Sequence, residues 1–338
     1  MTNQEHVLLD HGSGGLQSGN LIAGMMLPAF DHVILSRLED GATVELNGGR
    51  VAFTTDSYVV DPIFFPGGSI GDLAVNGTVN DIAMCGGKPQ YLSVGLIIEE
   101  GFALADLRAV VNDMARAART AGVQVVTGDT KVVSHGSADK IFINTAGLGI
   151  IAPGVDISAA HVRPGDQILL SGCIADHGVT ILSQRAGFSF ESPVTSDSAP
   201  LNRMVARMLD NSPGGIHALR DPTRGGVATV LNEIAARSET GIRIREESIP
   251  VKPSVAGLCE LLGLDPLYVA NEGKLLAFVD PGQAEGVLAA MRADPHGRDA
   301  TVIGEVVSDH PGRVAMATTI GGERLVDMPS GEQLPRIC

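Results

Sequence analysis

The stretch TTDSYVVDPIFFPGGSIGDLAVNGTVNDIAMCGGKPQYLS, residues 54–93, decides the fold. Its first residues continue a run rich in β-branched side chains after a Gly-Gly turn, which predicts a strand over 48–60. The middle predicts a largely apolar helix over 70–87 that is closed by glycines, and a second strand follows over 91–100. The chain therefore opens with a strand, a helix and a strand joined by short connections.

The same mixture continues on both sides of this stretch. A helix is predicted over 103–122, where Leu104, Leu107, Val111, Met114 and Ala118 share one face and Gly122 ends the helix. Two further strands are predicted over 123–133 and 140–151. Several strand pairs are linked by short segments, which favours an α+β fold over a doubly wound parallel sheet.

The second half restarts the pattern at HVRPGDQILLSG, residues 161–172, where a turn precedes a buried strand. We place the domain boundary near 152–160, so that residues 1–155 and 156–327 form two domains and 328–338 a tail; 338 residues suit two domains of ordinary size. The further elements predicted are helices over 176–187, 200–210 and 225–240, strands over 242–251, 267–279 and 300–307, and a hairpin over 313–326.

The composition limits the class of function. The formal net charge is −15, which disfavours nucleic acids and anionic membranes as partners and means that a polyanionic ligand needs divalent cations. We find no basic, apolar signal peptide and no apolar run long enough to span a membrane. The four cysteines are scattered without a CxxC pair, which is typical of a cytoplasmic protein.

Four aspartates form an acidic set: Asp40, Asp56, Asp81 and Asp129. Asp56 and Asp129 lie in apolar strand-like runs, and Asp81 lies in a largely apolar helix. Ionised carboxylates are rarely buried without a partner, and Mg²⁺ takes carboxylate and phosphate oxygens as ligands. Any one of these aspartates alone is better explained as a helix cap or a turn residue. As a set they predict a magnesium–nucleotide site.

Two glycine-rich segments could offer backbone N–H groups to phosphate. HGSGG contains His11, Gly12 and Gly14, and PGG contains Gly67 and Gly68 before the first helix. Neither fits a P-loop or a dinucleotide-binding motif. Taken alone, each is equally well explained as a turn.

Four other residues are candidates for chemistry or binding. Lys131 follows Asp129 at a strand end and could neutralise a phosphate, and Glu272 in NEGK could act as a general base. Arg224 in DPTRGG could hold an oxyanion, and His177 lies in ADHG at a strand-to-helix turn. The alternatives are a solvated lysine, an ordinary loop glutamate and a capping histidine.

The chain ends in EQLPRIC, so that Cys338 is the last residue. An exposed thiol at a chain end is a liability unless it is used. We expect the tail to be mobile, and ten extended residues reach roughly 33 Å, far enough to bring Cys338 into a cleft of its own subunit or of a neighbour.

Several stretches together resemble the HypE family of hydrogenase maturation proteins, carbamoyl dehydratases of the aminoimidazole-ribotide synthetase-like ATP-binding superfamily. The stretches are LLDHGSGG, the long 54–93 block, TGDTKVV, DHG, DPTRGG, NEGK and the terminal PRIC, and they span residues 8 to 338. The resemblance implies two α+β domains, the N-terminal one dimerising through its sheet and the C-terminal one an α/β sandwich. It also implies an ATP cleft lined by acidic residues.

The resemblance also implies the reaction. The terminal cysteine receives a carbamoyl group from the carbamoyltransferase HypF, and ATP-dependent dehydration gives a thiocyanate. Its cyano group then passes to iron on a HypC–HypD scaffold for [NiFe] hydrogenase. On this basis ATP and Mg²⁺ are the expected cofactors, and the predicted nucleotide-binding residues are His11, Gly12, Gly14, Gly67, Gly68, Asn76, Asp176 and His177.

The same residues fit this chemistry, with Asp40, Asp56, Asp81 and Asp129 for the metal and Cys338, Glu272, Lys131 and Arg224 for the reaction. Two other functions stay open. A small-molecule kinase or synthetase of the same superfamily would have no use for the terminal cysteine. A non-catalytic module whose tail docks on a partner would bind nucleotide without turnover.

Overall fold

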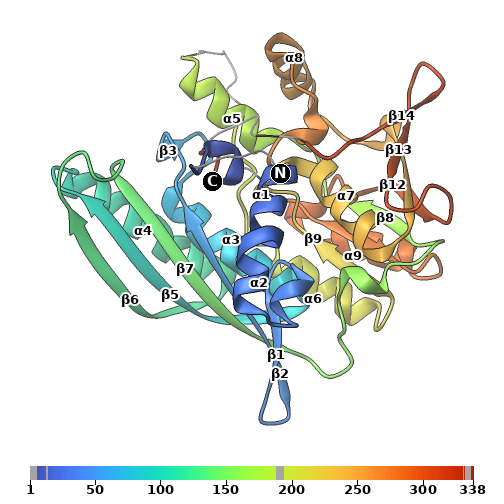
Figure 1. Ribbon diagram of the computed structural model, residues 1–338, viewed down its shortest axis with the longest axis horizontal. Helices are drawn as coiled ribbons and strands as arrows, with labels where there is room; N and C mark the ends of the chain where they lie inside the picture. Colours follow the sequence, from blue (N-terminus) through green and yellow to red (C-terminus); the bar gives the residue numbers. More distant parts are fainter. Residues whose placement is uncertain (1–5, 13, 188–193, 330, 332–335) are drawn as a thin grey trace.

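The computed structural model describes residues 6–12, 14–187, 194–329, 331 and 336–338. Figure 1 shows two bodies side by side, each built on its own sheet with helices packed against it. The predicted α+β class is confirmed. Within the described residues, no helix is long and apolar enough to cross a membrane.

The N-terminal sheet has the strand order β1-β2-β7-β5-β6, and only the β5–β6 pair is parallel. The strands are β1 (Ala42–Leu46), β2 (Gly49–Tyr58), β5 (Gly87–Glu99), β6 (Gln124–Val133) and β7 (Ile141–Ile151). Helices α3 (Ile70–Met84) and α4 (Leu104–Ala121) cover one face of this sheet (Figure 1). The predicted strands and both predicted helices are confirmed.

Helix α3 is the centre of the N-terminal domain, and the stretch that encodes it explains its position. Ser69 caps the helix, and Asp72 accepts a hydrogen bond from the Ser69 N–H at 3.0 Å, which completes a capping box. A Cβ on Gly71 would lie 2.4 Å from the Val110 carbonyl oxygen, and one on Gly77 would lie 2.2 Å from the Tyr58 hydroxyl. These glycines therefore let α3 pack closely against α4 and β2.

The C-terminal sheet has the strand order β14-β13-β10-β12-β8-β11-β9. Its strands are β8 (Gln167–Leu170), β9 (Ile216–Arg220), β10 (Gly241–Arg245), β11 (Leu276–Val279), β12 (Thr301–Val307), β13 (Val314–Ala317) and β14 (Glu323–Leu325). Its helices are α5 (Asp176–Arg185), α6 (Asn202–Asn211), α7 (Gly226–Ser238), α8 (Pro253–Leu262) and α9 (Ala284–Arg292). The three predicted helices and the closing hairpin are confirmed, whereas β9, α8 and α9 were not predicted.

The predicted strand over 267–279 is wrong in its first part, because only Leu276–Val279 is a strand. The Asn271 amide donates hydrogen bonds to the carbonyl oxygens of Pro222 and Val269, at 2.9 and 3.1 Å, and its oxygen accepts one from the Ala175 N–H at 2.8 Å. These bonds hold the chain in a loop instead of a ladder. The predicted strand over 242–251 likewise ends at Arg245, before a 3-10 turn.

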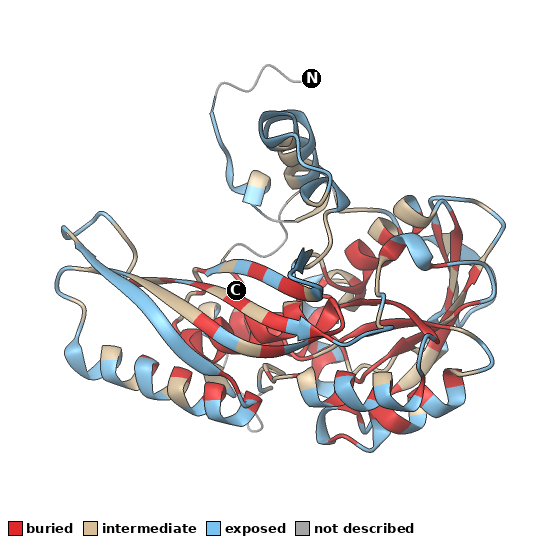
Figure 2. Cartoon of the chain, turned by 90° about the horizontal axis from the view of Figure 1, so that it is seen from below, coloured by how far each residue is buried: buried red, intermediate tan, exposed pale blue. Residues whose placement is uncertain are grey.

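Short elements complete the described part of the chain. They are η1 (Leu9–Gly12), α1 (Gly15–Leu21), η2 (Ile22–Met26), α2 (Leu27–Phe30), η3 (Leu35–Arg37), β3 (Phe64–Phe65), β4 (Gly68–Ser69), η4 (Ala159–His161), η5 (Glu246–Ser248), η6 (Pro266–Tyr268) and η7 (Pro295–Gly297). The segment from α1 to α2 buries no residue completely, and Figure 2 shows it standing away from both cores.

Candidate active site

A cleft of about 500 Å³ lies between the two domains, in the volume range of about 300–1,000 Å³ that is typical of ligand sites. Residues from η1 and α1, β2, α3 and the β9–α7 loop line it. Nine predicted site residues meet in this lining: His11, Gly12, Gly14, Asp40, Asp56, Asp81, Arg224, Glu272 and Cys338. The topology therefore joins residues that are more than 300 positions apart.

The acidic wall of the cleft, formed by Asp40, Asp56 and Asp81, brings like negative charges close together. Asp81 projects from α3 and accepts a hydrogen bond from the Thr54 hydroxyl at 2.9 Å. Burial, followed by the charges of Asp221, Asp56 and Asp40, raises the pKa of Asp81 well above its usual value. Burial also raises the pKa of Asp40, although Arg220 opposes this at 3.0 Å.

The same acidic wall is suited to bind a divalent cation that arrives together with an anionic ligand. Within the described residues, no three acidic, His or Cys side chains are arranged as a preformed metal centre. The Oδ2 atom of Asp40 is nevertheless buried without a hydrogen-bond partner. A bound cation would lower these raised pKa values and would give the unpaired Asp40 oxygen a partner.

Glu272 is the most deeply buried acid facing the cleft. Glu272 is 4% exposed, and its Oε1 atom has no hydrogen-bond partner among the described residues. Burial and then the charge of Asp221 raise its pKa well above the usual value, whereas Arg224 lowers it. Its backbone N–H donates to the Asp197 carboxylate at 3.1 Å, which fixes the loop. A buried carboxyl with a raised pKa is suited to proton transfer near neutral pH.

Arg224 supplies positive charge to the same cleft. Its Nη1 donates to the Gly12 carbonyl oxygen at 3.0 Å, so it also ties the N-terminal segment down. The pKa of Arg224 is raised, and the charge of Cys338 is the largest cause. The two glycines that follow have positive φ, and a Cβ on Gly225 would lie 2.1 Å from the Thr229 hydroxyl. The TRGG sequence thus permits the turn that places Arg224.

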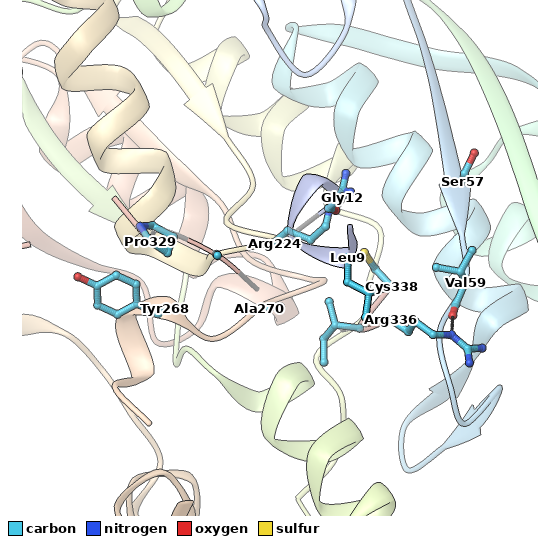
Figure 3. Close-up of a pocket in the computed structure, with 13 residues that line it drawn as sticks. Leu9, Gly12, Ser57, Val59, Arg224, Tyr268, Ala270, Pro329, Arg336 and Cys338 are labelled. Carbon is cyan, nitrogen blue, oxygen red and sulfur yellow. Dashed lines mark hydrogen bonds between the residues drawn. The ribbon is translucent and has the colours of Figure 1, made fainter. Parts of the chain in front are cut away.

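The end of the chain is docked beside this cleft. Cys338 lines both the cleft and an adjoining hollow of about 180 Å³, where its sulfur lies near Leu9 and Arg224 (Figure 3). The Val59 N–H donates to the terminal Cys338 oxygen at 2.9 Å, and Arg336 Nε donates to the Val59 carbonyl at 3.0 Å. Residues 336–338 thus lie alongside the segment that follows β2, whereas the tail residues 330 and 332–335 lie outside the described residues.

Seven predicted residues do not belong to the described lining of the cleft. Asp129 and Lys131 are exposed on β6, where they form an ion pair at 2.7 Å. Their strand is at the opposite edge of the sheet from β1, and the two residues are not part of the described lining of the cleft in their own chain.

The other five have structural partners instead. Gly67 and Gly68 lie in the β3–β4 turn, where a Cβ on Gly67 would lie 2.9 Å from the Ser196 carbonyl oxygen. The Asn76 amide donates to the Ser198 hydroxyl at 3.1 Å, and Asp176 forms an ion pair with Lys252 at 2.5 Å. His177 hydrogen-bonds the carbonyl oxygen of Ile337 at 2.7 Å, so it contacts the tail rather than the cleft.

Sequence reasoning missed several charged residues of the site. Asp221 lines the cleft, and burial raises its pKa to about 6. Arg220 is buried among carboxylates, with Glu233 at 2.6 Å. Asp221 opens the DPTRGG segment and Arg220 directly precedes it, so their motif was available as a signal. A neighbouring hollow of about 990 Å³ shares Glu39, Asp40 and Arg237 with the cleft and enlarges the space for a ligand.

Two family models match the chain. The model for the AIR synthase related protein N-terminal domain covers residues 38–151, and that for the C-terminal domain covers 163–316. The carbamoyl dehydratase HypE of Bradyrhizobium diazoefficiens is 57% identical over 98% of this chain and 95% of its own length. That of Escherichia coli is 48% identical over 98% of this chain and 99% of its own length.

Solved structures agree with the sequence relatives. A hydrogenase maturation protein HypE in complex with ATP is 53% identical, covers 98% of this chain and all of its own, and has a TM-score of 0.83. A HypE–HypF complex contains a chain that is 47% identical, with coverage of 91% and 99% and a TM-score of 0.87. A ThiL complexed with AMPPCP and TMP shares the fold at 19% identity and a TM-score of 0.73.

Proposed function

The chain belongs to the HypE family of carbamoyl dehydratases, and from this membership we propose that it dehydrates a carbamoyl group carried on its own Cys338. ATP is the co-substrate, the product is a thiocyanate on the same sulfur, and the cyano group is destined for the iron centre of a [NiFe] hydrogenase. One observation carries the proposal: Cys338 lines the same cleft as Glu272, Arg224 and the acidic wall.

The chemistry follows from the need to remove an oxygen that is a poor leaving group. The carbamoyl oxygen attacks the γ-phosphorus of ATP, and ADP leaves. The carbon–oxygen bond then breaks, so that the oxygen departs with phosphate, and the two nitrogen-bound hydrogens leave as protons to yield the nitrile. Phosphoryl transfer of this kind depends mainly on positioning and on stabilisation of charge.

Each residue of the cleft has a proposed task in this sequence. Glu272 accepts a proton from the amide nitrogen, because it is buried in the cleft and burial raises its pKa well above the usual value. Arg224 balances the negative charge that develops beside Cys338. His11, Gly12 and Gly14 lie where the backbone can meet phosphate oxygens.

Magnesium is proposed to arrive with the nucleotide. Asp40, Asp56 and Asp81 would hold it from the acidic wall, and it would neutralise the phosphates of ATP. The unsatisfied Oδ2 of Asp40 supports this assignment.

We further propose that the chain is a homodimer formed through its N-terminal sheet. The supporting observation is a set of exposed apolar residues that the strand register places on one face of this sheet: Phe53, Tyr91, Ile97 and Ile150. Monomeric proteins rarely expose a continuous apolar face. In that assembly, the exposed pair of Asp129 and Lys131 would serve the cleft of the partner subunit, in the metal and cation roles that their residue types suggest.

The proposed partners are a carbamoyl donor and an acceptor of the cyano group. The solved HypE–HypF complex supports HypF as the donor, and a HypC–HypD scaffold is proposed as the acceptor. The four free cysteines support a reducing, cytoplasmic setting. A small-molecule kinase of the same superfamily is not favoured, because the chain's own last residue lines the cleft.

An isotope experiment tests the reaction directly. The chain is carbamoylated on Cys338 with isotopically heavy oxygen in the carbonyl group and mixed with ATP and Mg²⁺. The proposal expects that the heavy oxygen appears in inorganic phosphate, while the peptide that ends at Cys338 loses the mass of one water. Heavy oxygen in bulk water, or nucleotide hydrolysis without any change of the peptide, would exclude the proposed mechanism.

A further inference from the structure

We propose that His177 and Arg185, on helix α5, form a clamp that grips the backbone of the last three residues and thereby positions Cys338 at the cleft. Both are positioning residues, since they act through the tail and do not line the cleft within the described residues. The inference deepens the proposed function and rests on it, because the clamped segment is then the arm that carries the substrate.

His177 contributes one directed hydrogen bond. The residue is fully buried, and burial lowers its pKa, so the imidazole is neutral. Its Nε2 lies 2.7 Å from the Ile337 carbonyl oxygen, which can only accept, so Nε2 must carry the proton. Nδ1 then accepts from the Ser196 hydroxyl at 2.8 Å. This second bond fixes the tautomer and aims the donor at the tail.

Arg185 contributes a bridge between the tail and the segment that follows β2. Its Nη2 donates to the Arg336 carbonyl oxygen, and its Nε donates to the Asp61 carbonyl oxygen at 2.5 Å. The Asp61 N–H in turn donates to the same Arg336 oxygen at 3.3 Å. A planar guanidinium is suited to holding two carbonyl oxygens in one geometry.

The clamp leaves little freedom to the end of the chain. The Ile337 side chain is 3% exposed and packs into the cluster that contains Tyr58, Val60 and Val179. With the bond from Val59 to Cys338, each of the three terminal residues has its carbonyl oxygen bound. The backbone that carries Cys338 is therefore held by an apolar anchor at Ile337 and by hydrogen bonds to its carbonyl oxygens.

The clamp can be tested without turnover. In the full-length chain, with neither carbamoyl donor nor ATP, alkylation of Cys338 by iodoacetamide is followed by mass spectrometry of the C-terminal peptide. His177→Phe and Arg185→Met are compared with wild type and with Gln184→Ala, an exposed neighbour on α5. Loss of a buried hydrogen bond should increase the Cys338 alkylation rate roughly ten-fold in both clamp variants and leave Gln184→Ala unchanged.

Two features of the chain keep the result interpretable. Cys85 and Cys259 are buried, so their alkylation reports global unfolding. His177→Gln retains an N–H donor and should restore most of the protection. If a clamp variant exposes Cys85 or Cys259, Ile337→Ala replaces it, since this change removes the anchor from the tail alone and should also increase the rate roughly ten-fold.

The proposal is overturned if Cys338 is alkylated at the wild-type rate in folded His177→Phe, Arg185→Met and Ile337→Ala chains. With the carbamoylated chain, the clamp variants should also slow a single turnover roughly ten-fold while the KM for ATP stays unchanged. An increased alkylation rate without any cyano product even in wild type would leave the clamp standing and refute the proposed function instead.

Discussion

Carboxylates of the cleft and of the β6 edge look alike in the sequence but differ in the fold. Asp81 and Glu272 are enclosed, and burial together with like charges raises their pKa values well above normal. Asp129 is exposed on β6, and its hydrogen bond with Lys131 lowers its pKa. An acid that the fold shields from water and leaves without a cationic partner is available to a ligand. An exposed acid that already forms an ion pair is not.

From this contrast we propose different functions for the two regions. The cleft holds the strained acids, Arg224 and the docked Cys338, so we propose it as the site of the reaction. The β6 edge holds a stable ion pair beside an exposed apolar sheet, so it is suited to assembly and to a contribution to another subunit's cleft. Variants in the two regions should therefore fail in different ways.

Removal of the reactive sulfur should have the largest effect. We expect Cys338→Ala to abolish cyanide formation completely and to leave ATP binding intact, because Cys338 is the residue proposed to carry the carbamoyl group. Product analysis and nucleotide titration measure the two properties. Cys173→Ala, which changes a partly exposed cysteine outside the docked segment 336–338, is the matched control. Residual product from the Cys338→Ala chain would place the substrate on another residue.

Neutralisation of the buried base should have the next largest effect. Glu272→Gln keeps the shape of the side chain but cannot accept a proton, so a single turnover should slow by about 10²–10⁴-fold. ATP affinity should be nearly unchanged or higher, because a buried like charge is removed from the acidic wall. Rapid-quench kinetics on carbamoylated protein measure the rate. Turnover at the wild-type rate would show that a different group accepts the proton.

The fold and part of the site could be predicted because their signals are local. The alternation in residues 54–93 and the helical face of 103–122 specify β2, α3, β5 and α4 directly. The loop at Asn271 could not be predicted, since the bonds that divert it come from Pro222 and Ala175, far away in the sequence. Short helices such as α8 were missed for lack of a long apolar period.

The site was only partly predictable for a similar reason. Residue type and motif selected Glu272, Arg224 and Cys338, and the fold brings all three to one cleft. Whether an aspartate on a strand faces a cleft or solvent depends on the position of its strand in the sheet, which sequence spacing does not encode. This is why Asp129 and Asp56 look equivalent in the sequence and are not equivalent in the structure.

A complementation experiment sharpens the comparison further. Asp129→Asn should lower activity roughly ten-fold if its carboxylate contributes one ligand or charge to a partner subunit's cleft. In mixed dimers, an Asp129→Asn chain supplies an intact Glu272, and a Glu272→Gln chain supplies an intact Asp129. One of the two clefts is then complete, so mixing should restore activity above that of either variant. An unrestored mixture would show that the β6 pair does not act across the dimer.

The smallest effect concerns stability, and here a variant in the cleft and a variant at the β6 edge should differ in their pH dependence. Burial raises the pKa of Asp221 to about 6, so the folded chain retains a proton that the unfolded chain loses at lower pH. Stability should therefore fall as the pH rises from about 4 to about 6. Above that window, Asp221→Asn should stabilise the ligand-free chain by on the order of 2 kcal/mol, and near pH 4 the gain should vanish.

Asp129 provides the contrasting case. Its pKa is lowered by the bond with Lys131, so its contribution is present at neutral pH and is lost as the pH falls. Because the pair is exposed, Asp129→Asn should leave the unfolding midpoint nearly unchanged at every pH. Urea unfolding of both variants from pH 4 to 8 measures the difference. If Asp221→Asn destabilises the chain at neutral pH, its carboxylate is paired in the ligand-free protein, and the contrast between strained cleft acids and a relaxed edge acid is wrong.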